Sequence, residues 1–450
     1  MATRTWIGNA AAVKQINTIT VALTWATSDT ATLTINSKDL VVTIGASTTT
    51  AQVALSIQEA IENIDFTDST ASRNLARGKL DFPELAEVTA TVSGSVVTLT
   101  AKTAGKPFTL AVTATTAGNG TATGATSTAA TGPNHFDAGD NWSTAGTPGT
   151  VPGTGDTLVY DQGRVDCLYA LSRGSVSYTV DVSKGWTGSL GLLPINRDNP
   201  SKPYREYRDR FLTVTATLTP TIGSGIGNMG RRVYLKADTI NNARIIDTGE
   251  EESRDDPPVQ IVGSGTTQIA EFRSGFIGIG VRAEDTTILE NFEQQGGGRS
   301  APRAVIGDGC SALVSGCDVR VSAGSVQLMS NVNVSNPIDF NVNGTGAVDL
   351  QGGKAGIVLL DQDADFIWQS ATSQNGSDQI SLRGKSKIDF SRVAAENGIG
   401  VNTIERFSDL SWVRDPNGVI STLVIDNNQC RDTSRLVLKV NSRLTVGTAS

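Results

Sequence analysis

Two hydrophobic patterns divide the chain, and the first occupies residues 16–115. INTITVAL, TATLTIN and LVVTIG alternate apolar with polar positions, which predicts strands with one buried face. Residues 49–64 then change period. Apolar residues recur there at three- and four-residue spacing, which predicts a helix with one apolar stripe and Thr49 or Thr50 as its N-cap. The stripe consists of Val53, Ile57, Ala60, Ile61 and Ile64. Residues 87–115 return to alternation around an SGS turn, which predicts a hairpin. Together these segments indicate a small α/β module.

The second pattern fills residues 136–445, where short β-prone runs are separated by Gly, Asn and Asp with almost no helical period. A coil of stacked strands buries alternate Val, Leu and Ile in each turn. We therefore predict a mainly β protein whose larger domain is a right-handed parallel β-helix, a solenoid with loops of varied length. A β-sandwich or a pair of jelly rolls is the structural alternative.

Two segments carry neither pattern. Residues 1–15 are expected to form an N-terminal arm, on which an isolated Trp6 needs a partner to cover it. Residues 116–135, rich in Gly, Thr and Ala, are expected to be a flexible linker between the two domains.

Composition narrows the function classes. The net charge of −8 lacks the Lys/Arg surplus that duplex binding needs, so nucleic acid is not an expected partner. No run of 18 apolar residues is present, and we expect no membrane span. The N-terminus also lacks the continuous apolar core of a secretory signal.

Residues able to carry chemistry are few. His135 is the single histidine, and it lies at the end of the expected linker, where a hinge or packing role is favoured. The four cysteines, Cys167, Cys310, Cys317 and Cys430, match no metal spacing and are interpreted as buried thiols, with a Cys310–Cys317 bridge as the alternative. The glycines at 296–298 lack a following Walker lysine and are not a phosphate loop. We expect no catalytic, cofactor or metal site.

Two acidic segments are candidate sites. Asp361, Asp363 and Asp365 alternate, so a strand would place three carboxylates on one face, with Phe366 and Trp368 available to stack on a sugar. The favoured interpretation is a solvated strand face. The segment from Asp247 to Asp256 also holds Glu250, Glu251, Glu252 and Asp255, and is interpreted as a solvated loop, with calcium or a subunit contact as the alternative.

The segment KPYREYRDR alternates aromatic and basic residues, which suits a glycan or RNA surface. The favoured interpretation is structural: a rung edge whose arginines pair with Asp or Glu. Its residues are Tyr204, Arg205, Tyr207, Arg208 and Arg210.

Several motifs resemble known families. The helix from Thr49 to Ile61 and the hairpin VTATVSGSVVTLTAKTAGKPFTLAV, from Val88 to Val112, are similar to a small module of phage structural proteins. The segments NWSTAGTPGTVPGTGDTLVYD and TGSLGLLPINRDNPSKPYREYRDRFLTV resemble β-helical proteins of phages and environmental bacteria, over about residues 137–290.

The resemblance implies a structural protein of a tailed-bacteriophage virion, assembled in the host cytoplasm: a capsid decoration protein or a head or tail fibre. Other virion proteins would be its partners, a homotrimer its expected assembly, and a host surface glycan a further candidate ligand. A tailspike depolymerase and a bacterial surface adhesin are the alternative functions.

Overall fold

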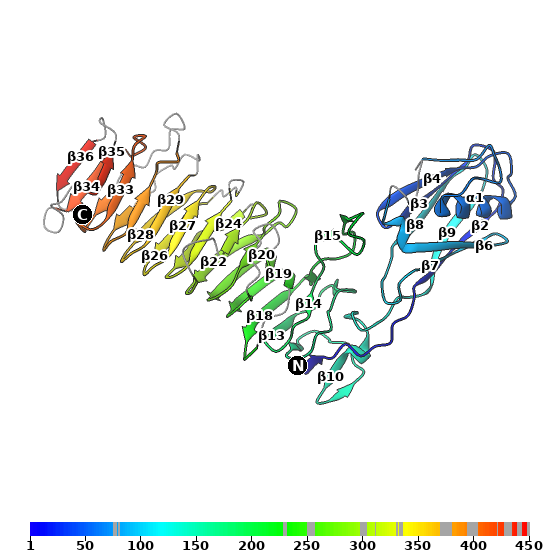
Figure 1. The fold of residues 1–450 in the computed structure, drawn as a ribbon, viewed down its shortest axis with the longest axis horizontal. Helices are drawn as coiled ribbons and strands as arrows, with labels where there is room; N and C mark the ends of the chain where they lie inside the picture. Colours follow the sequence, from blue (N-terminus) through cyan, green and yellow to red (C-terminus); the bar gives the residue numbers. More distant parts are fainter. Residues whose placement is uncertain are drawn as a thin grey trace.

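The computed structural model shows a mainly β protein, with 48% of residues in strands and 5% in helices, dominated by a parallel β-solenoid of about 10 turns (Figure 1). The fold class predicted from the pattern of short apolar runs is confirmed. The structure describes residues 1–74, 79, 82–227, 232–249, 257–297, 304–310, 312–329, 332, 336–369, 380–393, 404–420, 422–426, 434–438 and 443–447.

The first turns of the solenoid are irregular. They are built from β1 (Thr3–Trp6), β10 (Trp142–Thr144), β11 (Thr147–Pro148), β12 (Thr157–Tyr160), β13 (Tyr178–Ser183), β14 (Ser189–Leu190), β17 (Leu212–Thr213) and β18 (Thr217–Ser224), with the 3₁₀ turn η3 (Gly139–Asn141) before β10. Strand β1 runs parallel to β12, which is followed by β13 and β18 in parallel register. Two long strands, β19 (Arg232–Ile245) and β20 (Val259–Phe272), then carry the coil into its regular part.

Beyond β20 each turn contributes one strand to each of two parallel stacks. The first stack consists of β21 (Ile277–Ile279), β23 (Ala304–Ile306), β25 (Ser325–Leu328), β27 (Ala347–Leu350), β29 (Asp365–Trp368), β31 (Lys387–Asp389), β33 (Trp412–Asp415) and β35 (Leu436–Leu438). The second consists of β22 (Ile288–Gln294), β24 (Ala312–Val321), β26 (Ile338–Val342), β28 (Ala355–Leu360), β30 (Ile380–Leu382), β32 (Ile404–Arg406), β34 (Thr422–Asp426) and β36 (Arg443–Gly447). The continuous parallel pairing excludes the sandwich alternative.

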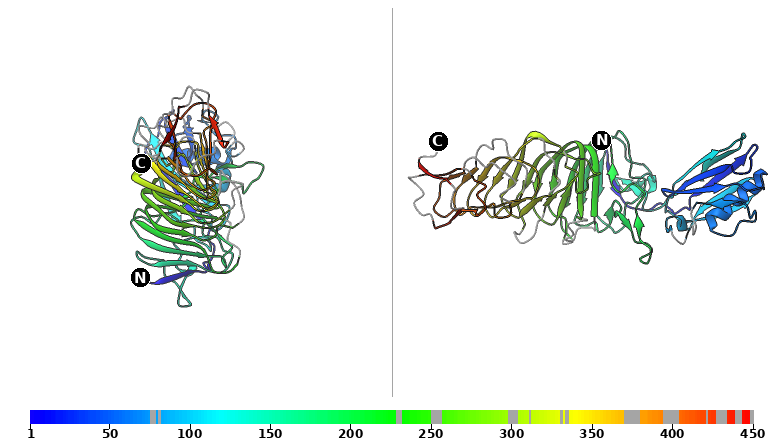
Figure 2. Two further views of the ribbon diagram at one scale, coloured as in Figure 1. Left: turned by 90° about the vertical axis from the view of Figure 1, so that its left-hand side faces the viewer. Right: turned by 90° about the horizontal axis from the view of Figure 1, so that it is seen from above.

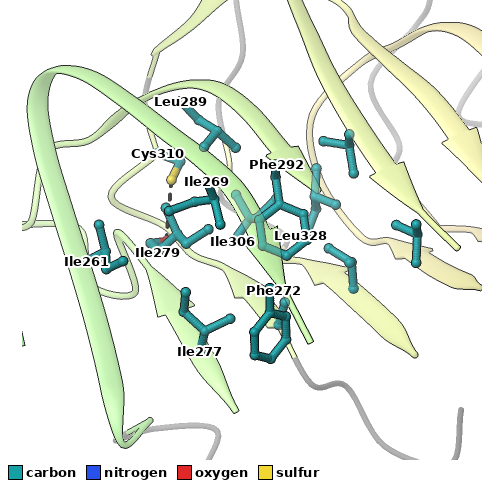
Figure 3. Packing of buried hydrophobic residues seen from close by; sticks show 14 of the residues in the cluster. Ile261, Ile269, Phe272, Ile277, Ile279, Leu289, Phe292, Ile306, Cys310 and Leu328 are labelled. Atoms are coloured by element: carbon teal, nitrogen blue, oxygen red, sulfur yellow. Dashed lines mark hydrogen bonds between the residues drawn. The ribbon is translucent and has the colours of Figure 1, made fainter. Parts of the chain in front are cut away.

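Apolar residues are in register from turn to turn, which explains the coil. In the first stack one column runs Val259, Ile277, Ala304, Val326, Val348, Phe366, Ile388 and Val413, all buried. Inward side chains of both stacks share one core, part of which is shown in Figure 3. Successive column members are 18 residues apart at Val348 and Phe366 but 27 apart at Ile277 and Ala304. No fixed repeat is therefore visible in the sequence.

The second stack has a charged side chain at an inward position. Arg406 is fully buried and lies in register after Leu382 in the second stack. Its guanidinium donates to the Ser411 hydroxyl (3.0 Å) and to the carbonyls of Asp409 (2.8 Å) and Ser411 (3.1 Å). The arginine thus supplies donors for a turn that folds back toward the core, which offsets the cost of burying its charge.

The module contains two four-stranded antiparallel sheets and one helix. One sheet has the order β6 (Val88–Ser93), β7 (Val96–Ala101), β2 (Ile16–Ala22), β9 (Thr121–Thr128), and the other β5 (Ser72–Arg73), β4 (Lys38–Thr43), β3 (Thr30–Ile35), β8 (Leu110–Thr115). Helix α1 (Thr50–Glu62) has the predicted N-cap, because the Thr49 hydroxyl accepts from the backbone of Gln52. The apolar stripe is buried except for Ile64, which follows the helix and is exposed.

The prediction of a flexible linker over residues 116–135 is wrong for its middle part. Residues 121–128 form β9, which pairs with β2 from Thr121 to Thr128. Small, polar side chains cannot build a core, but an edge strand needs only main-chain hydrogen bonds to its neighbour. The low hydrophobicity of this segment therefore does not indicate flexibility.

The expected arm is also wrong. Trp6 is 2% exposed, and its ring lies 5.0 Å from that of Trp142 and 6.0 Å from that of Tyr160, in the first turn of the solenoid. Its indole N–H donates to the carbonyl of Val165 (2.9 Å). The partner that covers this tryptophan belongs to the same chain.

The module is consequently an insertion in the first turn of the solenoid. The chain begins in the solenoid at β1, leaves it near Val13 and returns near Thr131, and the amide of Val13 donates to the carbonyl of Thr131 (2.8 Å). The module has a core of its own, separate from that of the solenoid. Figure 2 shows it beyond the N-terminal end of the rod, opposite the C-terminus.

Candidate functional site

The aromatic and basic segment at 204–208 lies in a loop that leaves the solenoid between β14 and β17. A short antiparallel ladder, β15 (Ile195–Asn196) with β16 (Tyr204–Arg205), gives this loop its shape, and the loop reaches toward the module (Figure 1). Glu206 fixes the next turn, because its buried carboxylate accepts from the backbone of Tyr207 (3.0 Å) and Arg208 (3.1 Å) and from the Asn196 amide (3.0 Å).

The loop meets the module at the carboxylate of Glu87, the last residue of the 3₁₀ turn η2 (Leu85–Glu87). One oxygen accepts from the Tyr204 hydroxyl and pairs with the Lys106 ammonium, and the other accepts from Tyr207 (2.6 Å) and from the Arg208 guanidinium. These five residues, Glu87, Lys106, Tyr204, Tyr207 and Arg208, are called the junction cluster below. Two of them come from the module and three from the solenoid loop.

Arg208 joins the loop to the module through several groups. It pairs with Glu87 and with Glu206 (2.8 Å), and its Nε donates to the carbonyl of Pro107 in the module (2.8 Å). The guanidinium lies 4.2 Å from the centre of the Tyr207 ring, and only 6% of its side chain is exposed. A planar guanidinium suits this role because it forms several hydrogen bonds in fixed directions while stacking on an aromatic face.

Burial and charge act in opposite directions on these groups. Burial by itself raises the pKa of the Glu87 carboxyl. The Arg208 charge and the hydrogen bonds from Lys106, Tyr204 and Tyr207 outweigh burial and hold that pKa below its ordinary value. Burial, reinforced by the Glu87 carboxylate, raises the pKa of the Tyr207 hydroxyl. At neutral pH Glu87 is therefore ionised and both tyrosines are protonated, which is the state that the hydrogen bonds require.

His135 makes a second contact between the two domains. It is 3% exposed, its Nε2 lies 2.9 Å from the Gly105 carbonyl of the module, and its Nδ1 lies 3.6 Å from the carboxylate of Asp137. The predicted packing role is confirmed, but the residue packs between the domains and not at the end of a flexible linker.

The structure thus gives KPYREYRDR a structural role with arginines paired to carboxylates, as favoured from the sequence. It does so in a protruding loop and not at a rung edge. Arg205 is mostly exposed and pairs with Glu284 (3.0 Å), and Arg210 lies near the ring of Phe211. Sequence reasoning missed Glu87 and Lys106. Glu87 is 121 residues from Arg208, and no local pattern distinguishes it from other surface glutamates.

The carboxylates of Asp361, Asp363 and Asp365 do not share a strand face. Asp361 and Asp363 lie in the turn between β28 and β29, and only Asp365 belongs to β29, where it faces Lys387 (3.6 Å). Phe366 and Trp368 point inward and are 1% and 0% exposed, so neither ring is available to a sugar. The predicted strand face fails because a left-handed Gln362 reverses the chain inside the segment.

The remaining candidate residues are the cysteines and the acidic segment that begins at Asp247. Cys167, Cys310 and Cys317 are buried and free, so the 310–317 bridge does not form, and the Cys310 thiol donates to the Ile279 carbonyl (3.4 Å, Figure 3). Asp247 pairs with Lys184 (2.7 Å). Cys430, Gly298, Glu250, Glu251, Glu252, Asp255 and Asp256 lie outside the described residues.

Comparisons with known protein families, characterised proteins and solved structures found no match. Within the described part of the chain, no helix is long and apolar enough to cross a membrane. Nor do three or more His, Cys, Asp or Glu side chains of the described residues gather as metal ligands. The junction cluster holds the protruding loop of the solenoid against the module through ion pairs and hydrogen bonds.

Proposed function

We propose that this chain is a structural protein of a tailed-bacteriophage virion, a capsid decoration protein or a head or tail fibre on the particle surface, without catalytic activity. The observation that supports it best is a parallel solenoid with a separate module held at its N-terminal end. This arrangement suits a protein that attaches at one end and projects at the other.

The sequence motifs add a second, independent line of support. The α1 segment and the β6–β7 hairpin are the parts of the module that resemble phage structural proteins, and the segments that resemble phage β-helical proteins fall in the first turns of the solenoid. Both resemblances thus fall within structural units of this chain.

We further propose that the module docks onto the particle while the solenoid points outward. Because Trp6 is buried, docking does not use an N-terminal arm. Because the junction cluster fixes the module to the loop at 191–211, we expect the rod to project in one direction, without the freedom to tilt that a linker would give. Other virion proteins are the proposed partners, and a homotrimer the proposed assembly.

Which part of the chain attaches to the particle is tested by removing the module. Residues 14–130 are replaced by a Gly-Ser turn, so that Val13 and Thr131 remain neighbours, and the variant is compared with the full chain for binding to particles that lack this protein. We expect the solenoid alone to stay in solution and the module alone to bind. If the solenoid binds and the module does not, the polarity is reversed.

The absence of glycan cleavage is tested with Asp361, Asp363 and Asp365, the three carboxylates in and next to the turn between β28 and β29. Wild-type protein and a variant with Asp361→Asn, Asp363→Asn and Asp365→Asn are incubated with host envelope polysaccharide, and new reducing ends are measured. We expect none with either protein and equal infectivity of the particles. Cleavage by the wild type that the variant loses would replace our proposal with a depolymerase.

A further inference from the structure

A pocket of about 400 Å³ opens beside the junction cluster, between the module and the protruding loop. Pro83, Ala86 and Phe108 of the module form its apolar wall, and Asn199 and Tyr204 line it from the loop. Its volume falls in the range of small-molecule sites, about 300–1,000 Å³, and such sites occur preferentially at domain interfaces.

The charge of this pocket is opposite to that of the chain. Four lysines line it, Lys79, Lys102, Lys106 and Lys202, against the two carboxylates of Glu87 and Asp198, which leaves a balance of +2. The whole chain carries −8. Just outside the pocket wall, Arg208 pairs with Glu87 and Glu62 pairs with Lys79, so these two neighbours together leave the balance unchanged. Low-dielectric walls focus such a potential, so the pocket attracts anions.

The lysines are held at different depths. Lys79 and Lys106 are 15% and 12% exposed and are fixed by Glu62 (2.8 Å) and by Asp198 (2.5 Å). Lys102 is exposed at the rim. Burial lowers the pKa of the Lys79 ammonium, and the charge of Lys102 lowers it further against the opposing effect of Glu62. An anion bound between these two lysines would relieve their repulsion.

We propose that this pocket binds a small anionic sugar, with its charged group held by the lysines and its ring against the apolar wall. The Thr103 hydroxyl and the Asn199 amide line the same pocket, and they suit the hydroxyl groups of a sugar. The charged group is a carboxylate, as in a uronic acid, or a phosphate, as in a sugar phosphate. This inference is independent of the proposed virion function.

The probes are glucuronate, glucose 6-phosphate, glucose and inorganic phosphate, titrated calorimetrically into the full chain at low ionic strength. We expect one of the two charged sugars to bind at least about tenfold more tightly than glucose or phosphate, because charge-assisted hydrogen bonds and ring contacts act together. Which of the two binds identifies the charged group. The proposal is overturned if neither binds, or if glucose or phosphate binds as tightly.

Matched charge changes locate the site. The double variant Lys102→Gln, Lys202→Gln should weaken binding about tenfold or more. The control Lys354→Gln, Lys385→Gln has the same change of charge far along the solenoid and should leave affinity unchanged. Equal weakening in both variants would mean a general charge effect and overturn the site.

A measurement on the unaltered protein keeps the test independent of variant folding. The bound sugar should slow acetylation of Lys102 and Lys202 by an amine-reactive reagent, while Lys385 reacts at its original rate. Equal rates with and without the sugar would overturn the proposal.

Discussion

At the scale of single residues, arginine side chains have different roles according to their burial and their partners. Arg406 is buried and donates to turn carbonyls, Arg208 joins two domains, and Arg205 forms a mostly exposed pair. The energetic consequence differs accordingly, since exposed pairs contribute about 0–1 kcal/mol, whereas removing one partner of a buried pair costs about 3–5 kcal/mol.

The junction cluster gives a pH-dependent prediction. Because the folded pKa of Glu87 is lowered, its contribution to stability is complete above its unfolded pKa, about 4.3, and is lost as the pH falls through the folded value. Glu87→Gln should therefore destabilise the joint by about 3 kcal/mol at pH 7, and the difference from wild type should vanish in acid. Thermal unfolding followed by calorimetry from pH 7 to pH 2 measures this difference.

The exposed Asp140→Asn provides the control, and its difference from wild type should be small at pH 7. A Glu87→Gln difference that stays constant over the whole pH range would contradict the assignment of a lowered pKa to this carboxyl.

At the scale of elements, each strand of the regular solenoid has an inner and an outer role. In β29 the inner side chains Phe366 and Trp368 join a row of aromatic contacts, in which Phe340 lies 5.2 Å from Phe366 and Phe390 lies 5.5 Å from Trp368. The outer side chains form ion pairs between turns, such as Asp365 with Lys387 and Asp389 with Arg414. The inner face supplies the stability.

Replacing an inner residue of β29 should therefore cost far more than replacing its outer neighbour. Trp368→Ala leaves a cavity among rings and should lower the free energy of unfolding by about 3–5 kcal/mol. Ile367→Ala on the same strand, pointing outward, should cost less than about 1 kcal/mol. Denaturant unfolding of the two variants gives the comparison, and similar losses would contradict the assigned faces.

Sequence patterns predicted local elements well and long-range pairs poorly. Alternation identified β2, β3, β6 and β7, and the change of period identified α1, because these signals are contained in one segment. The solenoid was predictable as a class because every turn buries alternate apolar residues.

The failures share one cause: the partner lies far along the chain. Trp6 looked unpartnered because Trp142 and Val165 follow more than a hundred residues later, and β9 looked flexible because β2 supplies its hydrogen bonds. The same limit hid Glu87 from the candidate site. Local periodicity carries no information about which distant segment completes a contact.

At the scale of the whole molecule, the inserted module and the solenoid have separate cores, and the junction cluster and His135 make contacts between them. Excision of residues 14–130 should therefore leave a folded solenoid whose circular dichroism keeps its β signal and whose β1 stays protected from hydrogen exchange. An aggregated product, or rapid exchange in residues 3–6, would show that the solenoid depends on the module.

The insertion also sets an order for folding during synthesis. Strand β1 pairs with β10 through Trp6 and Trp142, and with β12 through Thr3 and Thr157, so its first partner strand is made more than 130 residues later. At about 5–20 residues per second this delay lasts roughly 7 to 27 s. The module is complete earlier, and its folding brings positions 13 and 131 together. Folding of the module therefore offsets the entropic cost of closing that long loop before β1 pairs with the solenoid. In this way the module acts as an intramolecular assembly factor for the solenoid.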